Sequence, residues 1–227
     1  LVIRRQRQMC IRDSSSVANE LAKKSDLVIS VGSRLQDFTT GSNTLISCEM
    51  ISINVQNHDV VKHKSISLLG DAKVSVKLIL ERINNFHISK QYETEINRLK
   101  NLWEADVVRV TSKSDKNSLP SDSEVIGAVN RNVPKDTIVI GAAGSMPGEL
   151  HKLWKSGDVE GYHMEYGFSC MGYEIPAAIG VNLAEPDRPN VIFVGDGSYM
   201  MMNSELSTAV MMGLSLIHIS EPTRRSY

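Results

Sequence analysis

Short apolar strands that alternate with helices constrain the fold of this chain more than any other feature of its sequence. The clearest predicted strands are the apolar runs at 26–31, 50–55, 137–140 and 191–194. Helical patterns occupy 16–24, 71–83, 121–129 and 176–183. This alternation is typical of α/β domains with parallel sheets, so we expect an α/β fold.

A polar stretch over 84–120 separates two sets of strands and helices. It carries one amphipathic pattern around Ile96, Leu99 and Trp103, which predicts a bridging helix. After it, Ser121 and Glu124 form a capping-box pattern that opens the second set. We therefore predict a partial central α/β domain over 15–86, a linker with a bridging helix over 87–120, and a second partial domain over 121–213.

Both ends of the chain resemble translated sequencing adapter. Codons that can encode Met9 to Ser14 read, in reverse complement, as Leu-Ser-Leu-Ile-His, which is the run at 214–218. We therefore expect residues 1–14 and 214–227 to be adapter-derived, exclude them from fold prediction, and expect the remainder to be an internal fragment. The alternative is a basic N-terminal arm that binds nucleic acid or targets an organelle.

Charge and cysteine content narrow the function classes. The chain has 25 Lys+Arg and 26 Asp+Glu; six and two of these lie in the excluded ends, which leaves 19 against 24. A mildly acidic remainder without a basic stripe argues against nucleic acid or a membrane surface as partner. Cys48 and Cys170 show neither metal-ligand spacing nor a disulfide framework, so we expect a reducing, cytoplasmic location. No apolar run approaches the roughly 18 residues of a membrane span.

Asp196 lies between Gly195 and Gly197, directly after a predicted strand. Ligands of parallel α/β sheets bind beyond the carboxyl ends of the strands, and glycines permit close approach of the backbone. The helical stretch over 203–210 is placed to present its N-terminus to an anion, and a carboxylate beside such an anion commonly holds Mg²⁺. The pattern predicts a Mg²⁺ clamp on a diphosphate, although a tight turn alone is also compatible with Gly-Asp-Gly.

This motif, preceded by the run Cys-Met-Gly-Tyr-Glu-Ile-Pro-Ala-Ala-Ile-Gly at 170–180, resembles the cofactor-binding domain of thiamine-diphosphate enzymes of the acetolactate synthase superfamily. The segments 26–34 and 53–58 resemble the central domain of the same superfamily. Together the resemblance covers nearly all of 15–213. It implies a parallel-sheet thiamine-diphosphate-binding fold in two partial domains, with thiamine diphosphate and Mg²⁺ as cofactors.

The resemblance also implies roles for single residues. They are Asp196 as Mg²⁺ ligand, Gly197 and Ser198 as backbone contacts of the diphosphate with Gly195 beside them, and Met171 with Gly172 against the aminopyrimidine ring. Two family features are missing: the asparagine that ends the metal motif, and the domain whose glutamate activates the cofactor. The resemblance therefore implies that this chain alone is inactive.

Three segments, 34–41, 144–154 and 162–174, resemble the branch of the superfamily that hydrolyses a cyclic polyhydroxy dione in inositol catabolism. The implied reaction breaks the bond between two carbonyl carbons and releases 5-deoxy-glucuronate. A polyhydroxy substrate needs hydrogen-bonding partners, and His163 and Glu165 are predicted as hydroxyl partners or proton shuttles. Their alternative roles are purely structural: His163 capping a loop, and Glu165 pairing with a nearby cation.

Other reactive side chains are predicted to be structural. His151 is expected on the surface or in packing, and Cys170 is expected as a small packing residue beside Met171. The methionines at 200–202 are expected in a core between sheet and helix.

Two other functions stay open at this point. One is a carboligase of the acetolactate synthase type acting on pyruvate, and the other is a non-catalytic binding module that retains the cofactor fold. The carboligase and the hydrolase differ in substrate, which is pyruvate for one and a polyhydroxy dione for the other. A binding module would lack the cofactor-activating glutamate of the missing domain, and an enzyme would have it. Because active sites of this superfamily form between subunits, the resemblance implies a homodimer or homotetramer at full length.

Overall fold

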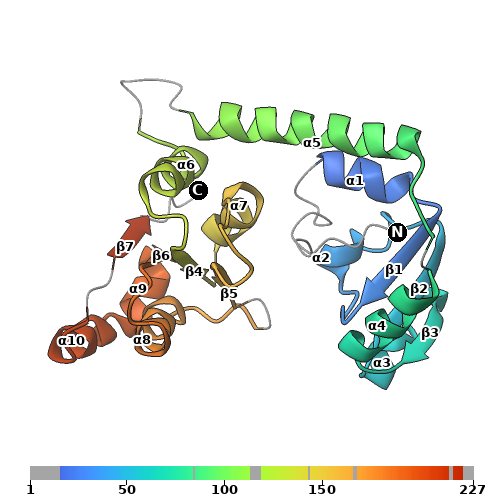
Figure 1. The fold of residues 1–227 in the computed structure, drawn as a ribbon. Coiled ribbons are helices and arrows are strands. Elements are labelled where there is room, and N and C mark those ends of the chain that lie inside the picture. The colour runs from blue at the N-terminus through green and yellow to red at the C-terminus, as the bar shows by residue number, and fades with distance from the viewer. Residues whose placement is uncertain are drawn as a thin grey trace. The chain divides into compact units, whose positions relative to one another are not determined.

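The computed structural model describes residues 16–83, 85–112, 119–142, 144–165, 168–214 and 217–221 (Figure 1). The predicted adapter segment 1–14 lies outside these residues. The chain divides into two compact units, Leu1–Asp106 and Val107–Tyr227. Each unit holds one parallel sheet with helices, which confirms the predicted α/β class.

The first unit contains a three-stranded parallel sheet in the order β1-β2-β3. Its elements are α1 (Ser16–Lys23), β1 (Leu27–Val31), α2 (Asp37–Thr40), β2 (Glu49–Asn54), α3 (Asn57–Val60), the 3-10 turn η2 (Lys62–Lys64), β3 (Ile66–Leu69) and α4 (Ala72–Arg82). Helix α4 begins where predicted because the Asp71 side chain accepts the backbone N–H of Val74 at 2.9 Å. Strand β3 was not predicted, since it is only four residues long.

Apolar side chains of β3 and α4 face solvent. Leu69 is 63% exposed and Val74 is 57% exposed, and α4 has no buried residue. The core of this unit lies instead around β2 and α3, where Ile53 and Val60 are buried. This pattern leaves apolar side chains of β3 and α4 uncovered.

The predicted bridging helix is α5 (Lys90–Thr111), which is longer than its amphipathic core suggested. The boundary between the two units falls inside it. Within the first unit, Lys24, which directly follows α1, donates to Glu95 of α5 at 3.0 Å. Arg98 donates to Glu95 at 2.7 Å and to Glu20 of α1 at 3.2 Å, so an ion network joins the two helices.

The second unit contains a parallel sheet in the order β5-β4-β6-β7. Its elements are α6 (Asp122–Asn132), β4 (Ile138–Gly141), α7 (Ser145–Leu153), β5 (Tyr162–Met164), α8 (Glu174–Ala184), β6 (Asn190–Gly195), α9 (Asp196–Met202), α10 (Ser204–Met211) and β7 (Ile217–Glu221). The capping box of Ser121 and Glu124 is confirmed, with both of its hydrogen bonds present. Among the described residues of both units, no helix has the length and apolar content needed to cross a bilayer.

Strand β7 lies within 214–227, the segment that we excluded from fold prediction. Ile217–Glu221 pairs with the outer edge of β6, with Val191 opposite Ile217. The segment alternates apolar and polar residues, and β6 would otherwise leave an edge of unpaired backbone groups. The adapter origin of the segment stays a prediction, and residues 222–227 lie outside the described residues.

Helices cover both faces of β6 in the second unit (Figure 1). On one face, Ile175 and Ala178 of α8 pack against Ile140 and Ile192, as expected of a small-residue helix. On the other, the Trp154 ring that follows α7 meets Phe193 edge to face at 6.0 Å. Coverage of both faces accounts for the unbroken apolar run at 191–194 within β6.

The predicted loop after Gly195 is instead a helix. Helix α9 begins at Asp196 and ends at Met202, before the helix predicted over 203–210. The prediction that Met200 and Met201 lie in the core is wrong, because they are 67% and 59% exposed. Tyr199, one turn before Met202, faces the core, so the two methionines between them point away from it.

Candidate functional site

The candidate site lies at the carboxyl edge of the sheet in the second unit. Gly195 ends β6, and Asp196 begins α9 at this edge. The turn that carries Met171 and Gly172 precedes α8. A hydrogen bond of 2.6 Å from Gly172 N–H to Ser198 Oγ joins that turn to the first turn of α9.

Four predicted cofactor-binding residues therefore come together. A Cβ added to Gly197 would lie only 3.0 Å from Met171 Cε, so the methionine side chain rests against this glycine. Gly172 has a φ of 89°, a conformation that favours glycine. A Cβ there would also lie 2.7 Å from Met202 Cγ. The motifs at 170–172 and 195–198 thus form one compact arrangement.

Sequence reasoning missed Glu174, which is completely buried beside this arrangement. Ser198 Oγ donates to Glu174 Oε2 at 2.6 Å. A charged residue inside the apolar start of α8 was the available signal, since buried carboxylates need polar partners.

Asp196 is placed suitably for a Mg²⁺ ligand. Its Oδ1 accepts the N–H of Gly197 at 2.6 Å, and a Cβ on Gly195 would meet no atom within 4 Å, so space is open beside the backbone. Within the described ranges, no group of three or more His, Cys, Asp and Glu side chains forms a metal cage. One carboxylate next to open space fits Mg²⁺, which takes its other ligands from phosphate and water.

His163 and Tyr173 form a second polar pair in this unit. His163 Nε2 lies 2.5 Å from the phenol oxygen of Tyr173, and the rings stack with centroids 5.8 Å apart. Burial, and then the charge of Glu165, raise the pKa of Tyr173. The phenol therefore stays protonated through the neutral range and is able to donate a hydrogen bond. The sequence had indicated His163 but not Tyr173.

Glu165 organises the loop that leads to Met171. Its carboxylate accepts the N–H of Phe168 at 2.8 Å and the N–H of Cys170 at 2.9 Å. The structural role of Glu165 is thus to hold these backbone groups. The structural alternative that we predicted was different, namely an ion pair with a nearby cation. The prediction that Cys170 is a packing residue is wrong, because this residue is exposed.

His151 has a packing role, as expected. Its ring meets Tyr162 edge to face at 5.9 Å, and Nδ1 lies 3.5 Å from the Tyr162 hydroxyl. His151 lies on α7, and its contacts with Tyr162 do not involve the cluster of Met171, Gly172, Gly197 and Ser198.

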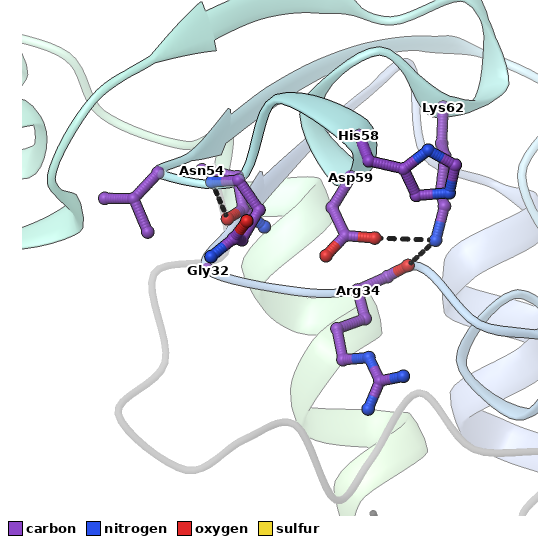
Figure 2. A pocket seen from close by; sticks show the side chains of 8 residues that line it. Gly32, Arg34, Asn54, His58, Asp59 and Lys62 are labelled. Atoms are coloured by element: carbon purple, nitrogen blue, oxygen red, sulfur yellow. Dashed lines mark hydrogen bonds and ion pairs between the residues drawn. The ribbon is translucent and has the colours of Figure 1, made fainter.

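An open cleft of about 630 Å³ lies separately in the first unit (Figure 2). Gly32 follows β1 and Asn54 ends β2, so the cleft is at the carboxyl edge of that sheet. Lys62 Nζ donates to Asp59 Oδ1 at 2.7 Å and to the Arg34 carbonyl at 2.8 Å. The Lys62 hydrogen bond lowers the pKa of Asp59. This cleft was not predicted and contains no residue of the Gly-Asp-Gly motif.

Comparisons with known proteins agree with the cluster in the second unit. Residues 142–220 match the family described as thiamine pyrophosphate enzyme, C-terminal TPP binding domain. The match runs through β7 and therefore includes residues 214–220, which the sequence analysis had set aside.

Similar proteins extend the likeness to most of the chain. A 3D-(3,5/4)-trihydroxycyclohexane-1,2-dione hydrolase from Clostridium tetani is 39% identical, over 88% of this chain and 35% of that protein. Proteins of the same name from Clostridium perfringens and Geobacillus thermodenitrificans are 38% identical, over 85% and 86% of this chain. The chain spans about a third of the length of these relatives. Residues 142–220 thus match the thiamine pyrophosphate enzyme C-terminal binding domains, within a chain that is similar over most of its length to trihydroxycyclohexanedione hydrolases.

Proposed function

We propose that the complete protein carrying residues 15–213 is a thiamine-diphosphate- and Mg²⁺-dependent hydrolase of 3D-(3,5/4)-trihydroxycyclohexane-1,2-dione. It would cleave the bond between the two carbonyl carbons and release 5-deoxy-glucuronate. The hydrogen bond from Gly172 to Ser198 carries this proposal, because it joins the two predicted cofactor-binding segments inside the matched domain. The names of the relatives support the substrate.

The chain's own residues would hold the cofactor in two places. Asp196 would bind Mg²⁺, with the backbone at Gly197 and Ser198 against the diphosphate. Met171 and Gly172 would support the aminopyrimidine ring. When bound, thiamine diphosphate supplies the electron sink that cleavage beside a carbonyl needs.

The substrate is neutral and rich in hydroxyl groups, so its pocket needs donors and acceptors that fix its orientation. His163 and Tyr173 offer such groups as a pair. We assign His163 as hydroxyl partner or proton shuttle. Glu165 would position the adjoining loop, since two N–H groups already occupy its carboxylate.

The intact protein is proposed to act in the cytoplasm as a homodimer or homotetramer. Its two cysteines in the described residues are free, as expected in a reducing compartment. The uncovered apolar side chains of β3 and α4 support burial of this surface in a larger assembly.

Turnover by the complete protein, obtained by extending the coding sequence past both ends, tests the proposal. The cyclic dione and pyruvate are offered in parallel with thiamine diphosphate and Mg²⁺. Loss of the dione with release of the deoxyuronic acid supports the hydrolase. Formation of acetolactate from pyruvate would instead indicate a carboligase. Binding of the cofactor without either reaction would indicate a binding module.

A further inference from the structure

Glu174 is a fully buried carboxylate that has no part in the proposed function above. Its exposed fraction is 0%, and it is the first residue of α8. Burial of a carboxylate costs free energy unless hydrogen bonds compensate. Ser198 Oγ is one of its partners, at 2.6 Å.

The hydroxyl of Ser198 connects this carboxylate to the turn before α8. A serine hydroxyl has one hydrogen to donate, and here it points to Glu174. Its lone pairs are then free to accept Gly172 N–H, also at 2.6 Å. Glu174 therefore fixes the hydroxyl in the orientation that accepts from Gly172.

This chain of hydrogen bonds connects both proposed cofactor contacts. Gly172 directly follows Met171, and Ser198 lies two residues after Asp196 in the first turn of α9. Glu174 thus ends a series of hydrogen bonds that runs through Ser198 to the turn before α8.

We infer that Glu174 is a positioning residue: through Ser198 it fixes the Met171–Gly172 turn relative to Asp196, and so sets the affinity for thiamine diphosphate. This inference rests on the proposed function. Substitution of Ser198 by alanine removes only the hydroxyl and leaves the backbone contact to the diphosphate in place, so it tests the hydrogen-bond chain by itself.

The test is calorimetric titration of the complete protein with thiamine diphosphate at saturating Mg²⁺. Glu174→Ala and Ser198→Ala are each expected to weaken binding about tenfold or more, as losses of supporting hydrogen bonds around bound ions do. The double variant is expected to bind no more weakly than either single one, because both changes break the same chain. Glu174→Gln is expected to restore affinity, since its amide oxygen accepts from Ser198.

Asp122→Ala is the matched control, because Asp122 also lies in the first turn of a helix, α6, and shares any favourable effect of a negative charge there. Its affinity should equal that of the unmodified protein. A lower melting temperature of Glu174→Ala with unchanged affinity would overturn the positioning role while the proposed function stands.

If Glu174→Ala does not fold, the affinities of Ser198→Ala and Glu174→Gln for thiamine diphosphate test the inference. Unchanged affinity in Ser198→Ala overturns the inference, and tenfold weaker binding there with normal binding in Glu174→Gln supports it. An unmodified protein that binds no thiamine diphosphate would instead remove the proposed function, and the inference with it.

Discussion

His163 Nε2 lies 2.5 Å from the hydroxyl oxygen of Tyr173, in a pair of stacked rings. If this pair contacts the substrate, Tyr173→Phe keeps the stack but removes the hydroxyl, and His163→Gln removes the ring. We expect each change to lower kcat about 100-fold, the order of magnitude of a lost acid–base group. Steady-state kinetics of the complete protein measure this, with thiamine diphosphate affinity unchanged.

His87→Gln provides the matched control for this pair, because His87 is exposed in the first unit. Its kinetics should equal those of the unmodified protein. Full activity in both Tyr173→Phe and His163→Gln would assign the pair a structural role only.

The Glu165 carboxylate accepts the backbone N–H groups of Phe168 and Cys170. Glu165→Ala should therefore speed hydrogen exchange at the amides of Phe168 and Cys170, since both lose their acceptor. Glu165→Gln should have a smaller effect because one oxygen remains. Exchange followed by mass spectrometry measures both variants, and unchanged protection in Glu165→Ala would refute the anchoring role.

Hydrogen bonds from Arg98, and then from Lys24, lower the pKa of Glu95 from its ordinary 4.5 to about 2. Because the folded value lies below the unfolded one, the ionised carboxylate stabilises the fold above pH 4.5, and this stabilisation is lost as the pH falls through about 2. In thermal unfolding, the unmodified protein should melt at a higher temperature than Glu95→Gln at neutral pH. This difference should disappear as the pH falls through about 2.

The Glu95 effect should be small and should shrink in high salt, since the network is exposed. Glu93→Gln, on the same helix, is the control and should keep the pH dependence of the unmodified protein, because Glu95 and its partners Arg98 and Lys24 are unchanged. An advantage of the unmodified protein that persists at the acid end would contradict the ion-network explanation.

Uncovered apolar side chains predict that residues 15–213 self-associate when prepared alone. Leu69 at the end of β3 is 63% exposed, and β3 is an edge strand with unpaired backbone groups on one side. Leu69→Lys should reduce association, whereas Leu119→Lys, far from the edge strand in sequence, should not. Light scattering coupled to size exclusion measures this. A monodisperse and cooperatively melting sample would contradict the prediction.

Strong local signals made much of the fold predictable. The strand ending at Gly195 is a continuous apolar run because it is covered on both faces, and α6 begins at its predicted capping box. Strand β3 was missed because four exposed residues carry no periodic signal. Helix α9 was missed because the glycines on both sides of Asp196 favour a loop.

The candidate site was predictable where it depended on motifs and unpredictable where it depended on tertiary contacts. The Gly-Asp-Gly and Met-Gly runs indicated Asp196 and Met171, and the structure places their segments together. Glu174 and Tyr173 were missed because their roles come from partners at distant or unrelated sequence positions. Glu165 was noticed for its charge, but its backbone partners depend on the shape of the loop.

The most direct test of the central claim is binding of thiamine diphosphate to the complete protein, with Mg²⁺ and with the metal chelated. Asp196→Asn is compared with Asp187→Asn, an exposed aspartate outside the cluster. We expect saturable, Mg²⁺-dependent binding in the unmodified protein and in Asp187→Asn. Loss of the metal carboxylate should weaken binding at least about 100-fold in Asp196→Asn. Equal binding by Asp196→Asn, or binding that does not depend on Mg²⁺, would contradict the assignment of this site.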